Sequence, residues 1–283
     1  MLVCYDKFMG TENSASPTNT EKSRTKKKQI EKIVKNKRAW YVYDEESGQE
    51  RFNLEASIAF LTALINEVIY PRHIKTKDVK GLLLSQFNSG LQFRIQVENE
   101  AKETSSDTFL NALIKSLKKL DEFVPVVLAS KGVIFFQYSK ADRTEVLGVI
   151  HNYWKGHENS PNNIRQFILE HDKISVLADH IKEIAASSEK PIKLIVVDDK
   201  NSELEAISKA LSEVDKVDLV VFQVTKDEAG QTNHQELYGQ ILTSVQNALD
   251  GGCQPLVVLD LDNTLIDTDR ALVNLADKLA SWG

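Results

Sequence analysis

Two aspartates near the C-terminal end of the chain have the type and spacing of groups that do chemistry. An apolar run at residues 255–259 stops abruptly at Asp260, and Asp262 and Thr264 follow at alternate positions. The run is short, rich in β-branched residues and preceded by two glycines, which indicates a buried parallel strand. Ligands of open α/β sheets bind beyond the carboxyl ends of such strands. We therefore expect both carboxylates at the mouth of a site.

Polar residues also follow other apolar runs of the chain. Ser130 comes soon after a predicted strand at 124–128, and Asp198 and Asp199 end a second one at 192–197. The acidic pair has a second interpretation, as a polar strand end followed by a helix N-cap. Lys173 precedes a helical stretch at 176–186.

The Asp-x-Asp-x-Thr pattern formed by Asp260, Asp262 and Thr264 resembles the nucleophile motif of the haloacid dehalogenase superfamily, most members of which are phosphatases. The resemblance implies that Asp260 attacks phosphorus and that Asp262 shuttles a proton. It implies a Mg²⁺-dependent hydrolysis of a phosphate monoester through an aspartyl-phosphate. Aspartate chemistry of this kind splits one hard displacement into two easier ones.

The same resemblance assigns the remaining residues. Ser130 would donate a hydrogen bond to the transferring phosphoryl group, and Lys173 would neutralise charge on the nucleophile and the phosphate, a role for which Lys155 competes. Mg²⁺ is the implied cofactor, since this hard cation prefers carboxylate, phosphate and water oxygens. The implied metal ligands are Asp260, Asp262, Asp198 and Asp199.

The order of these motifs departs from the family, in which the nucleophile comes first. In a tandem arrangement, Asp44 is the first aspartate of a domain and Asp260 opens a second domain that this sequence cuts short. In a permuted arrangement, the strand of Asp260 inserts between the strands that end at Ser130 and Asp198. Apolar helices follow both Asp44 and Asp260, and this apparent repeat favours the tandem arrangement.

Alternating strand and helix patterns predict an α/β fold: a Rossmann-like, three-layer parallel sheet of haloacid dehalogenase type with a small helical cap insertion. The expected boundaries are a disordered, basic tail at 1–38, an α/β domain at 39–250, a cap-like insertion at 55–120 and a strand–helix unit at 251–283. Two other functions remain open. One is a scaffold that keeps the fold without catalysis, and the other is a receiver-like module that accepts a phosphoryl group as a signal.

Length, composition and net charge limit the kinds of protein that this chain can be. The 283 residues are 42% hydrophobic and 27% charged, as in ordinary globular proteins, and contain no apolar run near the roughly 20 residues of a membrane span. The net charge of −6 disfavours nucleic-acid binding over the whole surface. The basic tail has two interpretations, a contact with an anionic partner and a solvated basic helix, and the second is favoured. Two distant cysteines suit a reducing cytoplasm. We expect a cytoplasmic protein with a small phosphorylated substrate, and the sequence does not fix its oligomeric state.

Overall fold

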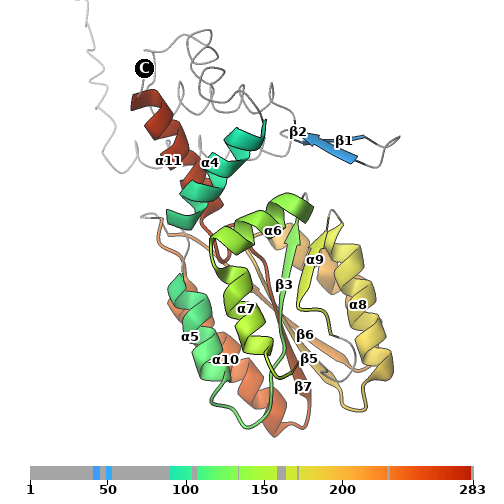
Figure 1. The fold of residues 1–283 in the computed structure, drawn as a ribbon. Helices are drawn as coiled ribbons and strands as arrows, with labels where there is room; N and C mark the ends of the chain where they lie inside the picture. The colour runs from blue at the N-terminus through green and yellow to red at the C-terminus, as the bar shows by residue number, and fades with distance from the viewer. Residues whose placement is uncertain are drawn as a thin grey trace, which may run out of the picture.

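A five-stranded, all-parallel sheet forms the centre of the molecule (Figure 1). The computed structural model describes residues 41–44, 49–52, 90–103, 107–132, 134–157, 164–170, 172–227 and 230–281. The strands lie in the order β4–β3–β7–β5–β6. Their bounds are β3 Val126–Lys131, β4 Phe167–Glu170, β5 Ile192–Asp198, β6 Val217–Gln223 and β7 Gln254–Leu259. The α/β class predicted from the sequence is confirmed.

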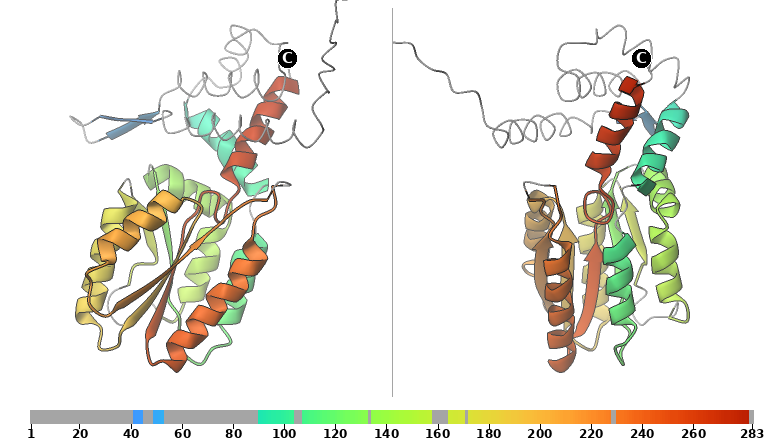
Figure 2. Two further views of the ribbon diagram at one scale, coloured as in Figure 1. Left: turned by 180° about the vertical axis from the view of Figure 1, so that it is seen from behind. Right: turned by 90° about the vertical axis from the view of Figure 1, so that its left-hand side faces the viewer.

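Helices cover both faces of this sheet, which makes a Rossmann-like, three-layer arrangement (Figure 2). Helices α8 and α9 pack on one face, while α7 and α10 cover the other and α5 packs against both of them. Helix α6 follows β3 at the carboxyl edge of the sheet. The bounds are α5 Asp107–Leu117, α6 Ile134–Arg143, α7 Val146–Trp154, α8 Lys173–Ser187, α9 Asn201–Leu211 and α10 His234–Asp250.

The last strand of the chain, β7, occupies the middle of the sheet. Val257 is paired with Val126 of β3, and Leu259 is paired with Val197 of β5. Residues 255–259 are buried throughout, because both faces of a central strand are covered. This is where the permuted arrangement puts the strand. The tandem arrangement is wrong on this point, since β7 belongs to the same sheet as β3 and β5.

Asp44 does not end a strand of the parallel sheet. It is the last residue of β1 (Tyr41–Asp44), which pairs antiparallel with β2 (Gln49–Phe52) in a separate two-stranded sheet. The apparent repeat between Asp44 and Asp260 is therefore a chance match of short motifs. Of the two strands compared, β7 has parallel neighbours on both sides, whereas β1 has an antiparallel partner.

The expected cap-like insertion at 55–120 extends too far. Helix α5 lies inside that range, yet its apolar face, including Leu110, Leu113 and Leu117, belongs to the same buried core as the sheet. The sequence correctly predicted a helical segment here, but it assigned the segment to a cap instead of to the core of the α/β domain. Helical periodicity does not show which neighbour a helix packs against. Residues 53–89, like the predicted basic tail at 1–38, lie outside the described residues.

Two further helices pack together beyond the carboxyl edge of the sheet: α4 (Gly90–Glu103) and α11 (Thr268–Ser281) (Figure 1). Buried carboxylates of α4 form ion pairs with the elements on either side. Glu98 pairs with Arg143 of α6 at 2.6 Å, and Glu100 pairs with Lys278 of α11 at 2.8 Å. Helix α4 therefore connects α6 to α11.

Strand β4, at the edge of the sheet beside β3, was not predicted from the sequence. Its four residues pair in parallel with β3, from Leu128↔Phe167 to Lys131↔Glu170. Such a short edge strand has too few residues to show a clear alternation. None of the helices in the described part of the chain has both the length and the hydropathy that a membrane span needs.

Candidate active site

The register of the sheet brings the predicted acidic residues to one edge. Asp198 is the last residue of β5, and Asp260 directly follows β7. Val197 is paired with Leu259, so Asp198 and Asp260 lie level on neighbouring strands. The amide of Asp260 donates to the carbonyl of Val197 at 2.9 Å, which continues the sheet as far as this carboxylate. The site lies at the carboxyl edge of a parallel sheet, where ligands of such folds bind.

Three carboxylates gather at this edge. Oxygen atoms of Asp198, Asp199 and Asp260 all lie within 4.8 Å of one another. Oδ2 of Asp260 is buried and has no hydrogen-bond partner among the described residues. Hard oxygen donors with an unsatisfied buried oxygen fit a hard divalent cation such as Mg²⁺. The three residues are the candidate ligands, and Asp262, the fourth ligand expected from the sequence, is not in this cluster.

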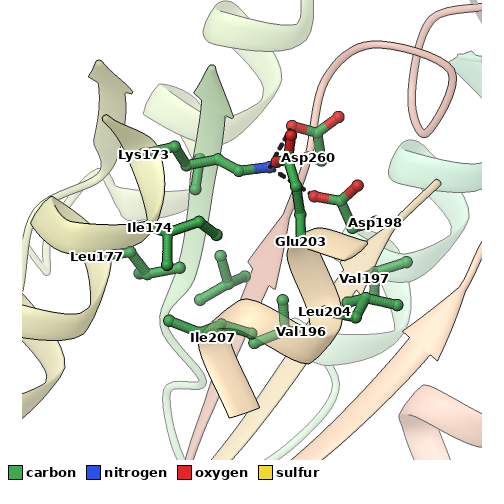
Figure 3. A pocket seen from close by; sticks show the side chains of 12 residues that line it. Lys173, Ile174, Leu177, Val196, Val197, Asp198, Glu203, Leu204, Ile207 and Asp260 are labelled. Atoms are coloured by element: carbon green, nitrogen blue, oxygen red, sulfur yellow. Dashed lines mark hydrogen bonds and ion pairs between the residues drawn. The ribbon is translucent and has the colours of Figure 1, made fainter. Parts of the chain in front are cut away.

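Lys173 stands in the middle of the carboxylates (Figure 3). Its Nζ lies 3.0 Å from Oδ1 of Asp260, 2.5 Å from Oδ2 of Asp198 and 2.5 Å from Oε2 of Glu203. Lys173 is the first residue of α8, and the side chain of Asp172 caps this helix by accepting the amide of Ser175. The helix start therefore fixes the point from which the lysine reaches into the site.

The charges around Lys173 shift one another's pKa. Burial alone would lower the pKa of Lys173, but Asp260, Asp198 and Glu203 together raise it well above its usual value. Burial raises the pKa of Asp260 to about 7, and it also raises the pKa of Asp198, in both cases against the opposing effect of Lys173. Lys200 also lowers the pKa of Asp260, so two ammonium groups face the four carboxylates of Asp198, Asp199, Asp260 and Glu203.

Glu203 differs from the two aspartates. Burial would raise its pKa, but Lys173 and Lys200 lower it overall. Nζ of Lys200 lies 3.5 Å from Oε1 of Glu203, and the amide of Lys200 donates to Oδ1 of Asp198 at 2.8 Å. The loop between β5 and α9 therefore holds Asp198 and Glu203 around the lysine.

Two buried hydroxyls at the same edge have no hydrogen-bond partner among the described residues: Oγ of Ser130 and Oγ1 of Thr264. Ser130 follows Leu128 of β3 by two residues, and Leu128 is paired with Leu259, so Ser130 lies near the level of Asp260. Buried hydroxyls usually find a partner in the protein or in bound solvent or ligand. These two are free to donate to a ligand oxygen.

Three donors hold the carboxylate of Asp262, which is outside the cluster of candidate metal ligands. The buried ammonium of Lys140 and the hydroxyl of Thr268 both donate to its Oδ1, and Nε2 of Gln137 donates to Oδ2 at 3.1 Å. Lys140 and Gln137 come from α6, and Thr268 begins α11. The prediction of Asp262 as a metal ligand does not fit this geometry, because both of its carboxylate oxygens are engaged elsewhere.

The loop that carries Asp262 is tightly folded. The amides of Leu265 and Ile266 both donate to the carbonyl of Leu261 at 3.0 Å, and Asn263 adopts a left-handed conformation with φ of 59°. Asparagine tolerates this conformation better than most residues. Nε2 of His234, at the start of α10, lies 2.8 Å from the carbonyl of Thr264. The loop is therefore fixed both by its own turn and by α10.

A small cavity lies beneath the site, between the sheet and helices α8 and α9. Its volume of about 10 Å³ is about the space of one water molecule. Most of its lining is apolar, with Ile174, Leu177, Leu204 and Ile207 below the charged groups (Figure 3). It is a packing void of the core and is too small to hold a substrate.

Lys155, the alternative to Lys173 as the lysine of the site, lies far from the carboxylates. Lys155 follows α7 at the opposite edge of the sheet, where Nε1 of Trp154 donates to the carbonyl of Val126 at 2.8 Å and Tyr153 donates to Val124. The sequence prediction missed Lys140, Gln137 and Thr268 as partners of Asp262. Residues on α6 carry no motif, and only the fold brings them near the loop.

The chain matches no family model, no curated protein and no solved structure. Any statement about its function therefore depends on the site itself.

Proposed function

We propose that this chain is a Mg²⁺-dependent phosphatase of the haloacid dehalogenase type, which hydrolyses a small phosphate monoester with Asp260 as the nucleophile. The observation that carries the proposal is the position of β7 between β3 and β5. This position places Asp260 beside Asp198, Asp199 and Lys173 and near Ser130, the residues that the sequence resemblance selects from distant parts of the chain.

In the first chemical step, a carboxylate oxygen of Asp260 forms a bond to phosphorus while the bond to the leaving oxygen breaks. Oδ1 of Asp260 is paired with Lys173, whereas Oδ2 has no hydrogen-bond partner among the described residues. A buried lysine and a free hydroxyl, that of Ser130, are suited to stabilise charge on the phosphoryl oxygens.

Asp262 is the candidate proton carrier. It would give its proton to the leaving oxygen and later take one from the water that hydrolyses the aspartyl-phosphate. Its carboxylate is held by Lys140, Thr268 and Gln137, so its position is fixed before the substrate arrives.

Asp198, Asp199 and Asp260 would hold Mg²⁺. The bound cation would screen the repulsion between the aspartate nucleophile and a phosphate dianion, and would stabilise charge on the phosphoryl oxygens. The raised pKa of Asp260 and of Asp198 gives a physical reason for such a cation at this place.

The test is turnover of 4-nitrophenyl phosphate with and without Mg²⁺. We expect Mg²⁺-dependent release of phosphate by the wild-type chain and a loss of at least about a thousandfold in Asp260→Asn, which lacks a nucleophile. Asp44→Asn is the matched control, because Asp44 ends a strand of the separate hairpin and should leave turnover unchanged.

Two other results would contradict the proposal. Loss of turnover in Asp44→Asn but not in Asp260→Asn would place the nucleophile in the N-terminal segment. Mg²⁺ binding without turnover of any phosphate ester would identify a scaffold that keeps the site but not the reaction.

A further inference from the structure

Among the described residues near the site, the most deeply buried cation is Lys140 of α6, which is less exposed than Lys173. The residue is 0% exposed, and its Nζ pairs with Oδ1 of Asp262, which is 122 residues away in the sequence. Burying an ammonium is costly unless it is paired and hydrogen-bonded. An aliphatic side chain would fill the same volume without the cost of burying a charge. A lysine at this position therefore suggests a functional role.

The donors around Asp262 are distributed unevenly over its two oxygens. Oδ1 accepts from the ammonium of Lys140 and from the hydroxyl of Thr268, whereas Oδ2 accepts from the neutral amide of Gln137. Hydrogen bonds to charged donors are roughly twice as strong as neutral ones. In these three hydrogen bonds Oδ1 is therefore the more strongly held oxygen of the carboxylate.

The anchor is itself rigid. Lys140 and Gln137 lie one turn apart on α6 and so share one face of the helix. Nε2 of Gln137 also donates to the carbonyl of Lys131 at 3.1 Å, which ties α6 to the end of β3. Arg143 at the end of α6 pairs with Glu98 of α4 at 2.6 Å. Helix α6 is thus held at both ends while it presents its lysine to the loop.

We propose that Lys140 is a positioning residue for proton transfer: its ammonium fixes Oδ1 of Asp262 so that Oδ2 exchanges the proton with the leaving oxygen. The inference rests on the proposed function. In the first step a carboxylate oxygen of Asp260 bonds to phosphorus, the P–O bond to the leaving group breaks, and the proton of Asp262 passes to the leaving oxygen. In the second step the oxygen of a water molecule bonds to phosphorus, the P–O bond to Asp260 breaks, and Asp262 takes the proton of that water.

A comparison of two leaving groups tests this role. 4-Nitrophenolate leaves easily without a proton, whereas the phenolate of phenyl phosphate depends more on the acid. We compare kcat/KM for the two substrates, because this constant reports the steps up to transfer to Asp260. In Lys140→Met we expect phenyl phosphate to lose at least about tenfold more kcat/KM than 4-nitrophenyl phosphate, within the range of general acid catalysis.

Lys193→Met is the matched control. Lys193 pairs with Asp218 at 2.5 Å near the opposite end of β5, and its loss should leave the ratio between the substrates unchanged. Thr268→Val removes the second donor to Oδ1 with little change in volume. It should shift the ratio in the same direction as Lys140→Met, which keeps the inference testable if Lys140→Met does not fold.

A crystal structure of metal-free Lys140→Met gives a readout without turnover, and we expect the carboxylate of Asp262 to leave its present orientation. Equal losses on both substrates, or an unmoved carboxylate, would overturn the role of Lys140 while the proposed function stands. A wild-type chain that hydrolyses neither substrate would instead overturn the proposed function itself, and the role of Lys140 with it.

Discussion

Lys173 is the residue on which the charge balance of the site depends. Its side chain is 3% exposed, and three carboxylates lie within 3.0 Å of its ammonium. Removing one partner of a buried ion pair costs far more than removing an exposed one, because the remaining charge stays buried without compensation. Here one substitution would leave several buried carboxylates facing one another.

We expect Lys173→Met to lower the free energy of unfolding by at least about 3 kcal/mol in metal-free buffer. Urea unfolding in the presence of a chelator measures this loss. Lys193→Met serves as the control, since its partner Asp218 has a side chain 64% exposed and the pair should contribute less than about 1 kcal/mol. Equal losses in the two variants would mean that Lys173 does not balance the buried charge.

At the residue scale, the sequence predicted the groups that a local motif can mark. Asp260, Asp198 and Asp199 each follow an apolar strand, and the structure brings them together. The partners of Asp262 were not predictable, because Lys140 and Gln137 are ordinary residues of an amphipathic helix. Nothing in the spacing of two residues 122 positions apart shows that they form an ion pair.

At the element scale, the turn from β3 into α6 controls how Gln137 reaches Asp262. Gly132 has a φ of 153°, and a Cβ added there would lie 2.5 Å from Nε2 of Gln137. The same Nε2 donates to the carbonyl of Lys131 and to Oδ2 of Asp262, both at 3.1 Å. The glycine therefore leaves room for a side chain that connects the strand to the loop.

Gly132→Ala should displace the amide of Gln137 and break both of its hydrogen bonds. We expect a loss of about 1–3 kcal/mol in the free energy of unfolding, with a fall in phosphatase activity. Thermal unfolding and turnover of 4-nitrophenyl phosphate measure the two effects.

Gly148→Ala is the control for this substitution. Gly148 is an exposed residue within α7, and an added Cβ has nothing within 4 Å. Alanine is the better helix former, so this variant should gain roughly 0.5–1 kcal/mol. An unchanged stability in Gly132→Ala would show that Gln137 can move away without loss.

The elements themselves were predictable to different degrees. Helix α8 and strands β3, β5 and β7 lie close to the ranges that the sequence pattern predicted. Strand β4 was missed because four residues carry little pattern, and α5 was put in the wrong layer. The period of a helix shows that it has an apolar face, but not which neighbour covers that face.

At the scale of the whole molecule, the order of the strands in space differs from their order in the chain. The sequence left the tandem and permuted arrangements open, because both are compatible with the same local patterns. The pairing of β7 with both β3 and β5 decides between the two arrangements. Strands β3 and β7 are more than a hundred residues apart in the sequence. Such long-range pairing is not encoded in any short stretch of sequence.

The central position of β7 predicts that the sheet depends on the last part of this chain. Without residues 251–283, β3 and β5 would lose the neighbour that they share, and the apolar side chains of β7, including Val257 and Leu259, would leave the core. Unpaired edges of two inner strands would also expose backbone donors and acceptors that water or another chain must satisfy.

We therefore expect a chain that ends at Asp250 to show no cooperative transition in urea, and to bind dyes that recognise exposed apolar surface. A chain that ends at Thr268 retains β7 and the loop of Asp262 but lacks most of α11, which packs on α4 beyond the sheet. This longer chain should unfold cooperatively at a lower urea concentration than the wild type. A cooperative transition in the shorter chain would show that β3 and β5 close on each other without β7, and would contradict the strand order on which the site depends.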